Sequence, residues 1–192
     1  RVLAAEPGHV NEVDESGFSA LIVAAANGNL QMVTELLSVK GIAVDLGNKG
    51  GDTACHSAAC FGHEAVVRAL AERGAGMDKP QTGIFGPATS PLWKESRNGH
   101  ESMVRCLLSL GALPVIPGLS ADEQPEAVAR SKGHAKLADY LRAVIDAGGY
   151  AAHEASKGQK PVAKSSVSLP ALAEAGELAE LKRVLAAEPG RV

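Results

Sequence analysis

Residues 53–63 read TACHSAACFGH, and close variants of this stretch recur along the chain. Each copy has a Ser, Thr or Gln at its start, then small and apolar residues, and then a Gly followed by a polar residue. The other copies are SALIVAAANGN at 19–29, SPLWKESRNGH at 90–100 and QPEAVARSKGH at 124–134. Their glycines follow one another at intervals of 34, 37 and 34 residues: Gly28, Gly62, Gly99 and Gly133. A recurring spacing of this length indicates a repeat architecture, in which each copy is one small structural unit.

Each copy predicts two antiparallel helices joined at the Gly. Thr53 or Ser90 can cap the first helix through its hydroxyl group, and Pro91 fits just inside a helix start. After the Gly, apolar residues recur at i, i+1, i+4 and i+5, which places them on one helix face, as in Met103, Val104, Leu107 and Leu108. No single pair of helices can enclose that face, so we expect neighbouring units to bury it by stacking.

Composition narrows the classes of function. The chain has 192 residues, of which 45% are apolar and only 3% aromatic, so Ala, Val and Leu must build a core of thin helices. The net charge is −3 and no long basic run is present, which argues against nucleic acid as a partner. No apolar run approaches the roughly 20 residues that span a bilayer. Three cysteines suit a reducing compartment, and we expect a cytoplasmic location.

The repeated stretch resembles the signature of the ankyrin repeat family, Thr-Pro-Leu-His-x-Ala-Ala-x-x-Gly-His. The resemblance covers about residues 1–146 and implies an all-α solenoid of stacked helix-turn-helix units joined by β-hairpin-like turns. It divides the stack into a half repeat at 1–16, repeats at about 17–50, 51–85 and 86–119, and a capping repeat at 120–146. Glu126 takes a Leu position in the last unit, as a polar terminal cap requires. The Ser90 unit is also irregular, because Glu95 takes an Ala position and Trp93 takes the position of His56.

The two ends of the chain are near copies. Residues 1–10 read RVLAAEPGHV and residues 183–192 read RVLAAEPGRV. We expect a linker at 147–166, rich in Ala, Gly, Ser and Lys, and an additional repeat-like helix pair at 167–192 that duplicates the N-terminal one. Two explanations are open. The ends can reflect tandem duplication within a longer parent chain, or the C-terminal pair can dock on the N-terminal edge of the same or another chain and give an assembly role.

Three features that could carry chemistry have simpler interpretations. Cys55, Cys60, His56 and His63 lie close in sequence, but the two cysteines are not spaced two to four residues apart in the manner of paired zinc ligands. The segment 47–52 is rich in Gly but lacks the ending of a phosphate-binding loop. No G-x-S-x-G elbow is present. We therefore predict a protein that is not an enzyme, with no catalytic residue, cofactor or metal.

The resemblance implies a module that binds a protein partner across an inner face made of hairpin tips and first helices. Carried over by position, the contact residues are Glu15, Ser16, Phe18, Asn27, Lys49, Asp52, Cys60, Phe61, Phe85, Thr89, Trp93, Arg97, Asn98, Glu123 and Lys132. Two of these have an alternative interpretation. Trp93 either fills the groove between adjacent first helices or anchors a partner. Phe85, with Ile84, either tucks a loop tip into the stack or exposes it as a contact.

Overall fold

The computed structural model describes residues 9–80 and 90–157, which belong to one compact unit, Arg1–Val162. Residues 1–8, 81–89 and 158–192 lie outside the described part. The predictions that fall on them are residues 1–8 of the half repeat at 1–16, the loop containing Phe85 and Thr89, the end of the linker and the helix pair at 167–192. These stay predictions.

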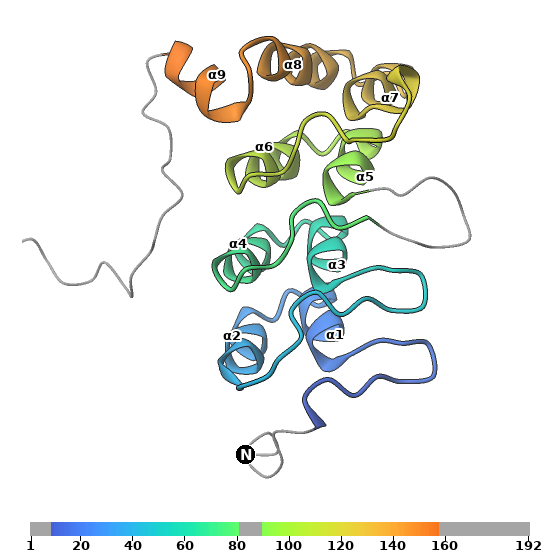
Figure 1. Ribbon diagram of the computed structural model, residues 1–192, viewed down its shortest axis with the longest axis vertical. Helices are drawn as coiled ribbons and strands as arrows, with labels where there is room; N and C mark the ends of the chain where they lie inside the picture. The colour runs from blue at the N-terminus through green and yellow to red at the C-terminus, as the bar shows by residue number, and fades with distance from the viewer. Residues whose placement is uncertain (1–8, 81–89, 158–192) are drawn as a thin grey trace, which may run out of the picture. The chain divides into compact units, whose positions relative to one another are not determined.

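The described residues form helices that follow one another in pairs (Figure 1). The first helices of the pairs are α1 (Ala20–Ala26), α3 (Ala54–Cys60), α5 (Pro91–Asn98) and α7 (Pro125–Ser131). Their partners are α2 (Leu30–Ser38), α4 (Glu64–Glu72), α6 (Glu101–Ser109) and α8 (Ala135–Asp146). A short 3-10 turn, η3 (Ala121–Glu123), precedes α7, and α9 (Tyr150–Ser156) follows α8. In the described loops, β pairing is limited to one isolated bridge between Val13 and Ser19.

Local sequence explains where the first helices begin. The Ser19 hydroxyl accepts a hydrogen bond from the Ile22 amide, and the Ser90 hydroxyl accepts one from the Trp93 amide, each at 3.3 Å. Thr53 is linked instead to the ring of His56, whose Nδ1 accepts from the Thr53 amide at 3.3 Å. These bonds satisfy amides that a helix start leaves without an intrahelical partner. The predicted capping role of Ser90 is confirmed.

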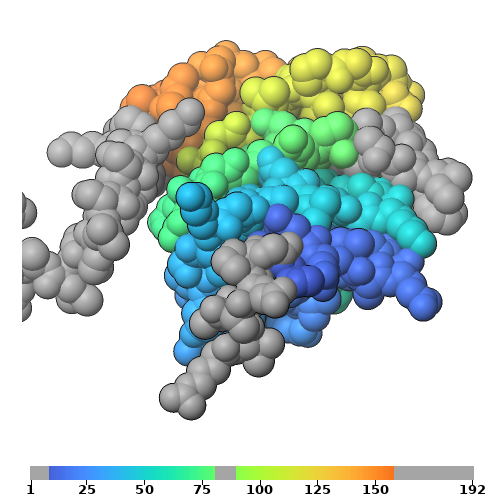
Figure 2. All heavy atoms as spheres, turned by 60° about the horizontal axis from the view of Figure 1, so that its bottom comes forward, coloured from blue at the N-terminus to red at the C-terminus, as the bar shows by residue number. Residues whose placement is uncertain are grey.

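Stacking of the pairs buries a continuous core. First helices pack on first helices, α1 on α3, α3 on α5 and α5 on α7, while α2 packs on α4 and α4 on α6. Small residues allow the close approach of the first helices, since Ala25, Ala58 and Ala129 are fully buried. Large apolar residues of the second helices, among them Leu36, Leu70, Leu107 and Leu141, fill the space behind them. In the space-filling view the successive pairs lie as successive bands (Figure 2).

The predicted linker at 147–166 is wrong in its first part, because Tyr150–Ser156 form helix α9. This helix packs against α8 and α6. Its buried residues are the polar His153 and Glu154, and the ring of His153 meets the ring of Tyr140 edge-on at 5.4 Å between centroids. A helix held through polar residues shows no apolar period, which is why its composition suggested a linker.

Candidate functional site

The residues predicted to contact a partner fall into two rows at opposite ends of the first helices. The first row lies in the segments around the helix starts and contains Glu15, Ser16, Phe18, Lys49, Asp52, Trp93 and Glu123. The second row lies at the helix ends and in the turns that follow, and contains Asn27, Cys60, Phe61, Arg97, Asn98 and Lys132. A first helix of seven residues separates the rows by roughly 11 Å, since an α-helix rises about 1.5 Å per residue. Phe85 and Thr89 lie outside the described residues.

Bonds between consecutive repeats hold the first row together. The Lys49 amide donates to the Ser16 carbonyl at 3.3 Å, which joins the first two loops. The Lys94 ammonium lies 3.7 Å from an Asp52 carboxylate oxygen and joins the second repeat to the third. The row is therefore one surface across several repeats and not a set of separate loop tips.

Trp93 joins the third repeat to the fourth. Its indole N–H donates to the Glu123 carbonyl at 2.7 Å, and the side chain is half-buried. Of the two interpretations of Trp93, this geometry favours the link between neighbouring repeats, because the N–H group that an anchor would offer to a partner is used within the protein.

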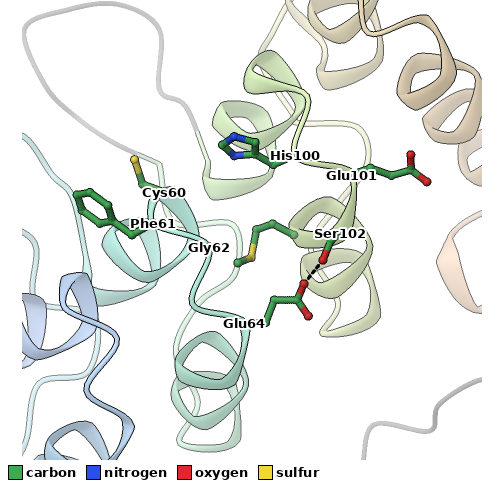
Figure 3. Close-up of a pocket in the computed structure, with 8 residues that line it drawn as sticks. Cys60, Phe61, Gly62, Glu64, His100, Glu101 and Ser102 are labelled. Atoms are coloured by element: carbon green, nitrogen blue, oxygen red, sulfur yellow. Dashed lines mark hydrogen bonds between the residues drawn. The ribbon is translucent and has the colours of Figure 1, made fainter.

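The second row contains a groove between the turn after α3 and the turn after α5. The groove has a volume of about 550 Å³ and is lined by Cys60, Phe61, Gly62, Glu64, His100, Glu101, Ser102 and Met103 (Figure 3). Cys60 and Phe61 were predicted as contact residues, and the structure brings them together here. Phe61 is 64% exposed, the most exposed of the large apolar residues in the described part of the chain.

Sequence reasoning missed the residues on the other side of the groove, namely Glu64, His100, Glu101 and Ser102. The Ser102 hydroxyl donates to the Glu64 carboxylate, so α6 and α4 meet at the groove edge. Glu101 is bound by its own helix, because Arg105 donates to one Glu101 oxygen from Nε at 2.9 Å and from Nη2 at 2.7 Å. The only sequence signal for this side was Glu95, the acidic residue in an Ala position.

Glu95 is completely buried below the turn, and its Oε2 lies 2.5 Å from His100 Nδ1. Burial raises the pKa of the Glu95 carboxyl, while the hydrogen bond and the charge of His100 act in the opposite direction. No hydrogen-bond partner for the second oxygen, Oε1, is found among the described residues. A buried carboxyl with one unpaired oxygen costs stability, so this site differs from the apolar contacts of the other repeats.

Cys55 and Cys106 do not have the surroundings of nucleophiles. Burial raises the pKa of the Cys55 thiol to about 12 and also raises the pKa of Cys106. A thiol with a raised pKa carries little thiolate, which is its reactive form. Within the described ranges, no group of three or more His, Cys, Asp or Glu side chains is placed to hold a metal ion. Nor does any helix of these ranges have the length and apolar character needed to cross a membrane.

Comparison with known proteins finds repeats of a known family in the first part of the chain. The family model described as "Ankyrin repeats (3 copies)" matches residues 1–82. The chain is similar to the ankyrin repeat-containing protein ITN1 of Arabidopsis thaliana, with 37% identity over 82 residues. The aligned part is 42% of this chain but only 13% of that relative, so the chain spans a small fraction of its length. Residues 1–82 therefore match ankyrin repeats, and the described helices of the chain form an all-α solenoid of stacked helix pairs.

Proposed function

We propose that this chain is a non-catalytic module that binds a protein partner across the two rows of residues at the ends of its first helices. The observation that carries the proposal is the first row, whose loops are joined from repeat to repeat while Glu15, Ser16, Phe18 and Lys49 stay exposed. Ankyrin repeats are generally protein-protein interaction modules and generally not catalytic. A surface fixed before binding loses little conformational entropy when a partner docks, which favours affinity.

The proposal includes a reducing compartment, and we infer a cytoplasmic location. The three cysteines are free, and Cys55 and Cys106 are buried in the core as thiols. Disulfides are rare in the cytosol, where reductants keep thiols reduced.

Charge reversal in each row tests the proposed surface. We expect the paired variant Lys49→Glu and Arg97→Glu to weaken binding of a partner protein by about tenfold or more, or roughly 1.4 kcal/mol. Both side chains are exposed, so the fold should persist. The partner is obtained by affinity capture on the wild-type chain, and its dissociation constant for each variant is measured with purified proteins.

The control is Arg73→Glu, an exposed residue at the end of α4 that belongs to neither row. Its affinity for the partner should equal that of the wild-type chain. Equal affinities for all three proteins would show that the partner binds elsewhere and would contradict the proposal.

A second candidate function, self-association, is favoured by the face of α2 that contains Met32. Met32 is 39% exposed, whereas the equivalent Val66, Met103 and Leu137 of the later repeats are at most 3% exposed. We propose residues 169–192 of a second copy as the occupant, because 183–192 nearly repeat 1–10. The chain should then show a concentration-dependent mass in light scattering that disappears in Met32→Glu and on deletion of 165–192. A constant mass at all concentrations would exclude this candidate.

A further inference from the structure

Three turns of the stack can be compared directly, because Gly28, Gly62 and Gly99 occupy the same place in successive repeats. At the first and the third, a histidine ring of the next repeat covers the glycine. A Cβ on Gly28 would lie 2.6 Å from the ring of His63, and a Cβ on Gly99 would lie 2.4 Å from the ring of His134. A Cβ on Gly62 would meet nothing within 4 Å in the described part of the chain. The junction between the second and third repeats therefore lacks the ring.

The ring that is absent from this junction belongs to His100, the residue equivalent to His63 and His134. His100 Nδ1 is hydrogen-bonded to Glu95 in its own repeat at 2.5 Å. The repeats of His63 and His134 offer these histidines no such acceptor, because the equivalent positions are Ala58 and Ala129. Glu95 thus holds His100 away from Gly62.

The groove of about 550 Å³ lies at this junction, with Gly62 and His100 among its lining residues (Figure 3). One difference between the repeats explains the groove. An acid in an Ala position binds the histidine of its own repeat, and the space that an imidazole fills at the neighbouring junctions stays open.

Three properties of the groove define what fits it. Gly62 has no side chain and, among the described residues, nothing covers it within 4 Å, so a flat group can lie there, while the ring of Phe61 stacks on His63 at 6.4 Å between centroids. At the first junction His63 Nε2 lies 3.1 Å from the Ala26 carbonyl, and the equivalent carbonyl at this junction is that of Cys60, so an N–H donor is favoured. Glu64 forms no ion pair within the described ranges, whereas Glu101 is compensated by Arg105. The groove therefore has an acidic edge that favours a positive charge.

We propose that this groove receives an arginine side chain of the partner protein and that Glu95 keeps it open by holding His100. This inference rests on the proposed protein-binding function and adds the chemistry of the partner. A guanidinium group is planar, always charged and rich in N–H donors, so it meets all three requirements. Lysine lacks the plane, and a neutral imidazole lacks the charge.

The test uses N-acetyl-arginine amide as the probe and N-acetyl-citrulline amide as its neutral isostere. Each is titrated into the isotope-labelled chain while backbone amide resonances are followed by NMR. We expect the arginine compound to cause saturable shifts at Phe61, Gly62 and Glu64, with binding about fivefold or more tighter than that of the citrulline compound. Equal binding of the two compounds, or shifts that do not include Gly62, would overturn the proposal.

Variants separate the two parts of the proposal. Glu64→Gln keeps an acceptor for Ser102 but removes the charge, and should weaken arginine binding by about fivefold. Its matched control is Glu72→Gln, an exposed acid at the other end of α4, which should bind as the wild type does. Glu95→Ala should release His100 to cover Gly62. A new nuclear Overhauser effect between these residues should appear, and arginine binding should fall.

Failure of this proposal can be told apart from failure of the proposed function. If arginine binding is unaffected by Glu64→Gln and Glu95→Ala while Lys49→Glu with Arg97→Glu still weakens the partner, then the groove is not an arginine site and the binding surface stands. If the reversed charges leave partner affinity unchanged while the arginine shifts respond to both variants, then the groove binds arginine and the wider surface is wrong.

Discussion

The variant Gly99→Ala should lower the free energy of unfolding by about 2–5 kcal/mol. Gly99 ends α5 with φ +78, in the left-handed region. An L-residue pays roughly 1–2 kcal/mol to adopt that conformation. The new methyl group would also lie 2.4 Å from the His134 ring, so this ring must leave the junction between the third and fourth repeats. Overpacking of this kind typically costs about 1–3 kcal/mol.

Gly62→Ala is the matched control for the crowding effect. Its φ is +77, almost the same as that of Gly99, but its Cβ would meet nothing within 4 Å in the described part of the chain. It should therefore pay only the conformational cost of roughly 1–2 kcal/mol. Urea unfolding of both variants gives the comparison, with an unchanged slope showing that the same transition is measured. If both variants lost equal stability, the histidine of the next repeat would not restrain the turn at Gly99.

The fold could be predicted from sequence because the repeats use similar residues at equivalent positions for the same physical task. Ser19 and Ser90 cap first helices, buried alanines bring these helices together, and one apolar face per second helix is buried by stacking. These interactions form within one repeat or between equivalent positions of neighbouring repeats, so the repeat spacing of the sequence predicts them. Helix α9 could not be predicted from the sequence because it is short and its buried side is polar.

The groove could be predicted only in part. Cys60 and Phe61 were found because they occupy exposed positions of the repeat, and the acid at position 95 was visible as an irregularity. What Glu95 does depends on which way the His100 ring turns, toward its own repeat or toward the preceding one. The ring can bond either to the Glu95 carboxylate or to a backbone carbonyl of the preceding repeat. The spacing of residues in the sequence does not show which of the two it selects. The role of Trp93 could not be decided from the sequence for the same reason, because its indole N–H could reach either a partner or the Glu123 carbonyl.

The Glu95–His100 pair predicts a second large effect, in the pH dependence of stability. Because burial raises the pKa of Glu95, the folded chain holds this proton more tightly than the unfolded chain does. The contribution of Glu95 to the free energy of unfolding is therefore highest below its ordinary pKa and falls as pH rises through the raised value. Glu95→Ala should remove this fall. At about pH 8 this variant should be more stable than the wild type by roughly 1–2 kcal/mol, and near pH 4 it should lose that advantage.

His100→Ala should have the opposite effect at about pH 8, with a loss of roughly 1–3 kcal/mol, because the buried carboxylate then keeps its desolvation cost without its hydrogen-bond donor. The histidine is about half exposed, so its own lost packing is small and the effect comes from Glu95. The double variant should therefore recover the stability of Glu95→Ala, and a double-mutant cycle by urea unfolding measures the coupling. Additive losses in the cycle would mean that the two side chains act independently. In that case Glu95 would not hold His100, and the open junction at Gly62 would need another cause.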